Sequence, residues 1–151
     1  MNTNDVQLFL TEARLCAFVM FESSISIQHD LADFQLPDIL HAEAIQICSA
    51  LIKTKDELHP ELADFEKLLT SVAIDESSWL DAINLILKWL WGNVPQLENV
   101  IKSLENSTEY QPQCQRAALI VARSTDKIVE AFNRSLTAAK RITDERLLRW
   151  N

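Results

Sequence analysis

The sequence predicts an all-α fold, a single-domain antiparallel bundle of five to six helices over residues 1–151 with a long C-terminal amphipathic helix. Composition is the first observation, because the 151 residues include only one glycine and four prolines. Turn-rich β folds need many more residues that accept positive φ. Length is the second, since a chain of this size buries a core without disulfides or a metal. The third is the recurrence of apolar residues every three or four positions, which is typical of amphipathic helices.

The first helix is predicted from residues 4–5, which can cap its free amides, to about Glu22. Between residues 13 and 21 it is apolar nearly all round, and only Arg14 interrupts the run. A helix of this kind lies either at the centre of its bundle or in an oligomer interface. The pattern therefore permits a homodimer.

The pattern then loosens at Ser23 and Ser24, and a short helix or an irregular segment is expected up to Gln35. Prolines and capping residues mark the later helix starts. Helices are expected to begin at Pro37, Pro60, Asp75 or Ser78, and Pro95.

Several helix ends are also predicted. Cations at Lys53–Lys55 suit the C-terminal dipole of the second main helix. The helix from Pro60 is expected to reach about Val72, and Gly92 is expected to stop the following helix in the left-handed conformation. A polar loop is expected over residues 106–111.

The last helix, predicted over Gln113–Ile142, has an apolar face and a cationic face. Five cations recur along it at steps of seven, four, seven and seven. They are Arg116, Arg123, Lys127, Arg134 and Arg141, and we call them the cationic stripe. At about 100° per residue they fall within an arc of about 40°, roughly opposite the apolar face.

Two tryptophans follow each other closely before Gly92. Trp91 falls with Asn84 and Lys88 on the polar side of its helix, where it either packs at the helix end or forms an exposed anchor. Exposed tryptophans are enriched at binding hot spots, so the predicted partner-binding set is the cationic stripe plus Trp91. Trp89 adjoins the apolar face, and partial burial is expected for it.

Charge is unevenly distributed along the chain, whose formal net charge is −8. Residues 1–112 carry 18 acidic and 6 basic side chains, a net of −12, and residues 113–151 carry 4 acidic and 8 basic, a net of +4. An acidic body repels nucleic acid phosphates, so nucleic acid is not the expected partner. The cationic stripe suits an acidic protein surface instead.

Cysteine usage and hydropathy bear on location. The 3 cysteines are widely spaced within apolar segments, which favours buried free thiols in a reducing cytoplasm. The chain has no apolar run long enough for a membrane span, and its first residues lack the basic region of a secretory signal. A cytoplasmic protein is the expectation.

Two acidic pairs at i and i+3 form the candidate metal site. They are Asp30 with Asp33 and Glu61 with Asp64, and 27 residues separate the two pairs. On two neighbouring helices, four convergent carboxylates would hold Mg²⁺ and orient a triphosphate.

This pattern resembles that of the all-α nucleotide pyrophosphohydrolases of the MazG type, in which Glu-x-x-Glu is followed at similar spacing by Glu-x-x-Asp. The resemblance covers residues 30–64. The first pair has aspartate where the family has glutamate, and Pro37 follows too closely for that helix to continue as the family's would. The resemblance implies magnesium-dependent hydrolysis of nucleoside triphosphates.

Other catalytic patterns are missing from the sequence. His29 and Asp33 are the only histidine–carboxylate pair at helical ligand spacing, and a polar surface role is expected for His29. No Gly-x-Ser-x-Gly elbow occurs, and one glycine cannot build a phosphate-cradling loop.

The favoured function is therefore non-enzymatic: a small acidic cytoplasmic protein that binds another protein, as an inhibitor or immunity protein, a chaperone or an adaptor would. No cofactor is expected for it. The alternative is the pyrophosphohydrolase reading, in which Asp30, Asp33, Glu61 and Asp64 bind Mg²⁺. The sequence leaves open whether the counter-charges of the cationic stripe lie within the chain or on a partner.

Overall fold

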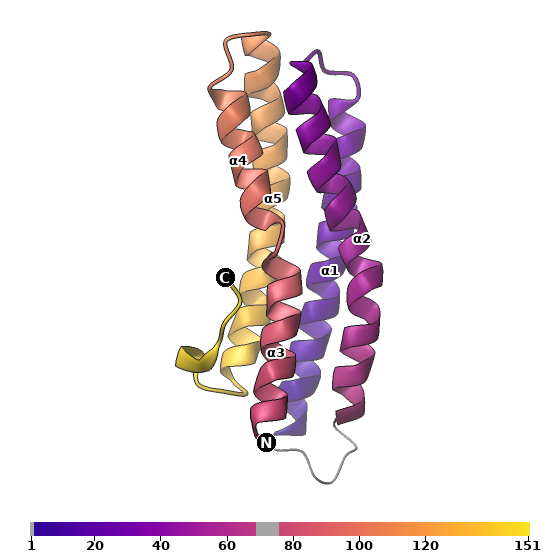
Figure 1. Ribbon diagram of the computed structural model, residues 1–151, viewed down its shortest axis with the longest axis vertical. Helices are drawn as coiled ribbons and strands as arrows, with labels where there is room; N and C mark the ends of the chain where they lie inside the picture. Colours follow the sequence, from indigo (N-terminus) through magenta and orange to yellow (C-terminus); the bar gives the residue numbers. More distant parts are fainter. Residues whose placement is uncertain (1, 69–75) are drawn as a thin grey trace.

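The computed structural model describes residues 2–68 and 76–151, and it confirms the all-α class. Its helices are α1 (Thr3–Leu31), α2 (Asp38–Leu68), α3 (Glu76–Trp91), α4 (Val94–Glu105) and α5 (Gln111–Lys140), followed by a 3₁₀ turn at Glu145–Leu147. Helices α3 and α4 run end to end, so the described helices form four rods that alternate in direction (Figure 1). The long amphipathic last helix lies within two residues of its predicted bounds.

Helix α1 is longer than predicted, because it continues through Ser23 and Ser24 to Leu31. Both serines are buried, so they pack between helices and do not loosen the chain. Ile27 and Leu31 extend the same buried face by two further turns. The expected end near Glu22 was therefore wrong: tertiary burial outweighs a serine's helix penalty of a few tenths of a kcal/mol.

Helix α2 likewise runs through Pro60, where two separate helices were expected. A proline inside a helix removes one backbone hydrogen bond and costs about 3 kcal/mol. Leu58 and Leu62, on either side of it, are both buried, and each buried leucine contributes about 1.5–3 kcal/mol. This burial offsets the proline. The predicted continuation to Val72 and the candidate cap Asp75 lie outside the described residues.

The junction between α3 and α4 is a two-residue break in one rod. Gly92 does not adopt a positive φ there, so the prediction of a left-handed stop was wrong. The break follows from Pro95 in the first turn of α4, whose ring prevents the α3 hydrogen-bond ladder from continuing. A Cβ added at Gly92 would lie 3.3 Å from the carbonyl oxygen of Lys88, so the small residue fits a close approach at this point.

The helices do not pack equally tightly around the core. Helix α1 packs most extensively against α5 and α2, and α5 also packs closely against α4. Buried alanines let backbones approach one another, among them Ala13 and Ala17 on α1 and Ala131 and Ala138 on α5. Helix α2 packs less extensively against α3 and α4 than against α1. The α2 side of the α3–α4 rod is therefore more loosely packed than the α1–α2 pair.

The C-terminal segment, residues 141–151, folds back beside α5 and α3, and we call it the C-terminal strap (Figure 1). The Asn84 amide donates to the carbonyl oxygen of Leu147 at 3.2 Å, and the backbone N–H of Arg149 donates to the Asn84 Oδ1 at 2.8 Å. Leu148, between these two bonds, is buried. One side chain on α3 thus fixes the strap on both sides of a buried leucine.

Candidate functional site

The five side chains of the cationic stripe are all exposed along α5, as their arc predicted. Two of them have counter-charges within the chain. The Arg134 Nη2 lies 2.7 Å from the Glu130 Oε1, and the Arg141 Nε lies 3.4 Å from the Asp5 Oδ1. Arg116, Arg123 and Lys127 make no ion pair within the described residues.

Acidic residues of α1 run beside the stripe. Glu12 lines the same shallow groove as Arg134 and Arg141, and Glu22 lines another with Lys127. With Asp5, these carboxylates give the lower part of the stripe an acidic neighbour on α1. The stripe's counter-charges therefore lie partly inside the chain. Arg116 and Arg123 make no ion pair among the described residues, although Asp126 follows Arg123 by three positions on α5.

Trp91 is not the exposed anchor that the sequence allowed. Its ring lies 4.8 Å from that of Phe132 and 5.3 Å from that of Trp150, measured between centroids. Trp150 belongs to the C-terminal strap and also contacts Phe132 at 5.1 Å. Trp91 therefore packs against the core and the strap and is partly buried, as the packing alternative expected.

The four carboxylates of the candidate metal site do not converge. Asp30 and Asp33 lie at the end of α1, next to the turn into α2, whereas Glu61 and Asp64 lie near the other end of α2. Glu61 is about 23 residues beyond the start of α2, which corresponds to about 35 Å along the helix. Within the described residues, no group of three or more His, Cys, Asp or Glu side chains could hold a metal ion. The pyrophosphohydrolase reading loses the arrangement on which it depended.

The other candidate side chains have ordinary surroundings. The His29 Nδ1 lies 3.6 Å from the Asp30 Oδ1, not from Asp33, and its side chain is largely exposed. Burial raises the pKa of the Cys16 and Cys48 thiols to about 12, so neither is a nucleophile at neutral pH.

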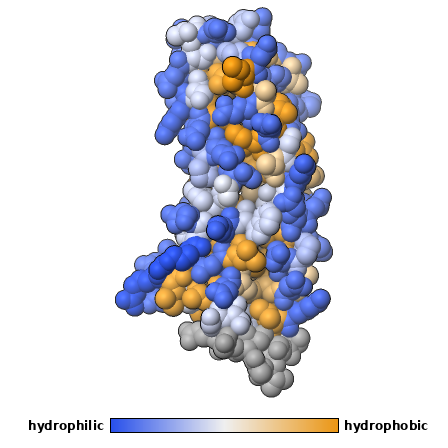
Figure 2. Space-filling view, in the orientation of Figure 1, coloured by the Kyte–Doolittle hydropathy of each residue, from blue (hydrophilic) through white to orange (hydrophobic). Residues whose placement is uncertain are grey.

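A groove opens where α2 packs loosely against the α3–α4 rod, between the middle of α2 and the end of α3, and we call it the α2–α3 groove. Its volume is about 720 Å³, which is within the range of small-molecule pockets and leaves room for a large side chain of a partner. Small residues make the room for it: Ala50 on α2 faces the α3–α4 break at Gly92. On the face drawn in Figure 2, hydrophobic residues reach the surface in several separate places among hydrophilic ones.

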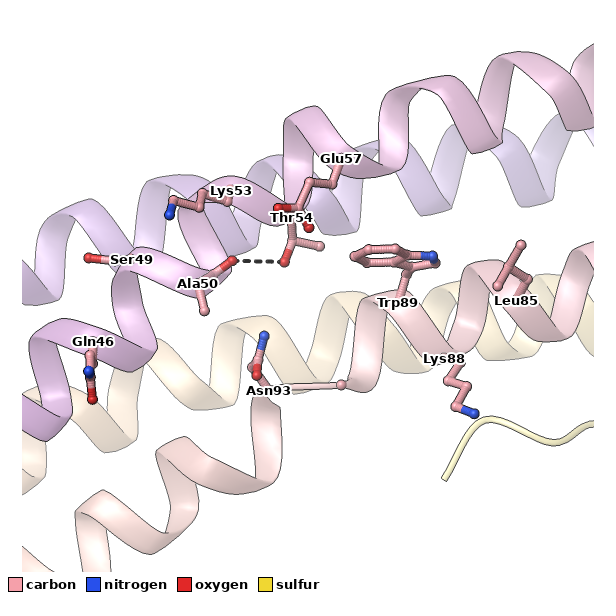
Figure 3. A pocket seen from close by; sticks show the side chains of 11 residues that line it. Gln46, Ser49, Ala50, Lys53, Thr54, Glu57, Leu85, Lys88, Trp89 and Asn93 are labelled. Carbon is pink, nitrogen blue, oxygen red and sulfur yellow. Dashed lines mark hydrogen bonds between the residues drawn. The ribbon is translucent and has the colours of Figure 1, made fainter.

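Apolar and polar side chains share the lining of this groove (Figure 3). The Trp89 ring extends from α3 toward α2 and is 36% exposed, and Leu85, one turn earlier, is 44% exposed. The Thr54 hydroxyl donates to the carbonyl oxygen of Ala50 at 3.1 Å, and the Gln28 amide donates to the Ser49 hydroxyl at 3.1 Å. These two hydroxyls already have partners.

Charged and amide side chains form the rim. Lys53 and Glu57 come from α2 and Lys88 from α3, and none of the three makes an ion pair within the described part of the chain. Gln46 and Asn93 add amide groups. The sequence predicted that Trp89 adjoins the apolar face of its helix, but it did not predict a groove. The groove depends on how α2 packs against the α3–α4 rod at its two-residue break.

Within the described residues, no helix is both long and apolar enough to cross a membrane. Comparison with known proteins gives no match: no family model, curated protein or solved structure is significantly similar to this chain. The geometry of its surfaces is therefore the basis for a functional conclusion.

Proposed function

We propose that this protein acts by binding another protein, and that the α2–α3 groove receives an apolar side chain of that partner. The observation that carries the proposal is Trp89, which lines the groove and keeps more than a third of its surface exposed. Tryptophans in such positions dominate the energetics of protein interfaces, and truncation of one often costs 2 kcal/mol or more, roughly thirtyfold in Kd.

The groove also indicates the chemistry of the partner segment. An apolar side chain of the partner would lie between Leu85 and Trp89 on one side and Ala50 on the other. Lys53 and Lys88 stand on opposite walls without an ion pair among the described residues, against the single acidic residue Glu57. A helical segment with one apolar face and acidic flanks fits this lining.

An inhibitor, a chaperone or an adaptor would each use such a surface. None of these roles needs a catalytic group or a cofactor, and the groove supplies a binding surface on rigid helices. The net charge of −8 favours association with basic surfaces elsewhere on a partner, because charge complementarity speeds encounter and selects partners.

Site-specific photo-crosslinking in the host cell tests the proposal. A photoreactive amino acid replaces Gln46, which lines the groove, or Gln115, an exposed glutamine on α5 that does not line it. We expect a covalent adduct with one protein from position 46 and none with that protein from position 115. The adduct should be lost when Trp89→Ala is added, with folding checked by circular dichroism.

Three results would contradict the proposal. Equal adducts from both positions would mean that contact is not specific to the groove. An adduct that survives Trp89→Ala would remove the tryptophan from the interface. Absence of any protein adduct, together with a small molecule retained by the purified protein in native mass spectrometry, would make the groove a small-ligand site instead.

A further inference from the structure

Helix α1 presents a second surface, on the side that faces away from the core. Six residues recur there at alternating steps of four and three, and all six are exposed. They are Thr11, Leu15, Phe18, Glu22, Ile25 and His29, and we call them the α1 seam. Steps of four and three are the spacing at which one helix packs along another.

The apolar members of this seam are large and unusually accessible. Leu15 and Ile25 are each 43% exposed and Phe18 is 44% exposed. The opposite side of α1 is fully used in the core, where Cys16 and Met20 are buried, so α1 has apolar residues on both sides. A row of large apolar residues along one exposed helix face marks an interaction surface.

Among the described residues, the Lys55 side chain of α2 covers only part of the α1 seam. The Lys55 Nζ lies 4.6 Å from the ring centroid of Phe21 and 5.5 Å from that of Phe18. This contact shields one edge of the seam on the α2 side and leaves Leu15 and Ile25 uncovered.

Charges on and beside the seam indicate what occupies it. Arg14, on the α2 edge of the seam, precedes Phe18 by four residues, and Glu22, on the α5 edge near Lys127, follows it by four; both are exposed. If two copies of α1 pack antiparallel about Phe18, the Arg14 of each copy lies opposite the Glu22 of the other. The same register sets Leu15 against Phe21 of the other copy. A parallel pair would instead place arginine against arginine and glutamate against glutamate.

We propose that the α1 seam binds the α1 seam of a second copy of this chain, antiparallel, about a two-fold axis at Phe18. The interface is self-complementary, as a two-fold axis requires. In the single chain, the Arg14 Nη2 lies 2.8 Å from the Glu66 Oε2, an exposed pair that contributes little to stability and can be exchanged for a bond across the interface.

This inference is independent of the proposed function. No residue of α1 lines the α2–α3 groove, so the groove stays open in each copy of the dimer. Two chains of net charge −8 repel each other, and salt screens that repulsion over about 8 Å at physiological ionic strength. We therefore expect a reversible dimer whose population follows mass action.

Sedimentation velocity of the full chain over about a hundredfold range of concentration measures this equilibrium. Phe18→Glu should leave only monomer. The matched control is Leu119→Glu, which introduces the same charge at a leucine on α5 that is 60% exposed and outside the seam. The control should dimerise like the unchanged protein.

Charge exchange tests the antiparallel register. All charge variants carry Glu66→Gln, so that loss or reversal of the intramolecular pair with Arg14 cannot explain the result. In that background, Arg14→Glu alone should weaken the dimer by about tenfold or more in Kd. Adding Glu22→Arg should restore the affinity.

The outcomes are decisive in each arm. A chain that stays monomeric at every concentration overturns the inference, and so does a dimer that Phe18→Glu leaves intact. A dimer that depends on Phe18 but is not restored by the charge exchange overturns the antiparallel pairing. Crosslinking at Gln46 tests the groove, and sedimentation velocity tests the dimer. Absence of a dimer therefore does not contradict the proposed function, and absence of a groove adduct does not contradict the dimer.

Discussion

Burial determines the chemistry of two of the cysteine side chains. For Cys16, loss of solvent around the thiolate raises the pKa from 9.0 to about 12, although a hydrogen bond with Ser135 lowers it in part. For Cys48, burial alone raises the pKa to about 12. Both thiols therefore hold their protons under conditions in which an unfolded chain has lost them.

This difference makes stability depend on pH in the alkaline range. Above pH 9 the unfolded chain releases these two protons while the folded chain retains them, so the free energy of unfolding falls as pH rises toward 12. The loss is about 1.4 kcal/mol per pH unit for each thiol. Urea unfolding at several pH values should show that the free energy of unfolding falls more steeply with pH for the unchanged protein than for the Cys16→Ala, Cys48→Ala double variant. Identical slopes would show that the thiols are not the cause.

The C-terminal strap is held to the helices by a small set of specific contacts. Asn84 makes two hydrogen bonds to the strap backbone, and Trp150 completes the aromatic cluster with Trp91 and Phe132. Both hydrogen bonds are exposed, and each contributes about 0.5–1.5 kcal/mol. The strap should therefore detach before the helices unfold.

Asn84→Ala should release the strap while the bundle stays folded. Trypsin should then cut sooner after Arg146 and Arg149, and the near-ultraviolet circular dichroism of the tryptophans should weaken, while the far-ultraviolet helix signal should change little. Asn133→Ala, at an exposed asparagine on α5, serves as the matched control. Equal proteolysis of the two variants would mean that Asn84 does not hold the strap.

The elements also show which structural features local sequence can predict. Pro37 and Pro95 correctly indicated helix starts. A proline at this position loses no helical hydrogen bond, and its fixed φ already suits a helix, so the preference does not depend on other helices. Pro60 and the Ser23–Ser24 pair were misleading, because the burial of neighbouring leucines and of the serines themselves depends on other helices. Helix interiors follow periodicity, whereas helix continuity is decided by tertiary packing.

The same limit applies to the candidate sites. The arc of the cationic stripe follows from spacing alone, and all five side chains are exposed as expected. The α2–α3 groove could not be predicted, because it depends on where the small residues Ala50 of α2 and Gly92 of the α3–α4 break lie once the helices have packed. The acidic pairs Asp30–Asp33 and Glu61–Asp64 are separated because antiparallel packing carries the second pair to the far end of α2.

At the scale of the whole molecule, the fold reduces the charge asymmetry of the sequence. The basic C-terminal quarter lies on α5 beside α1, whose Asp5, Glu12 and Glu22 face the stripe. Neutralisation is uneven. Within the described residues, Arg134 makes an ion pair with Glu130, whereas Arg123 makes none. The upper end of the stripe, at Arg116 and Arg123, is where an acidic partner would find unpaired cations.

Arginine-to-glutamate substitutions at positions 134 and 123 of α5 compare a paired cation of the stripe with an unpaired one. Arg134→Glu breaks the i,i+4 pair with Glu130 and should lower the free energy of unfolding by about 0.3–0.5 kcal/mol at low salt. Arg123→Glu replaces a like-charge neighbour of Lys127 at i+4 by an attractive pair in the favourable order, but it also places a carboxylate three residues from Asp126. These two changes oppose each other, so stability should stay about equal. Urea unfolding at low and high salt should show the two variants apart at low salt and converging at high salt. If both substitutions destabilise equally at low salt, Arg123 has a counter-charge inside the chain and is not an unpaired cation of the stripe.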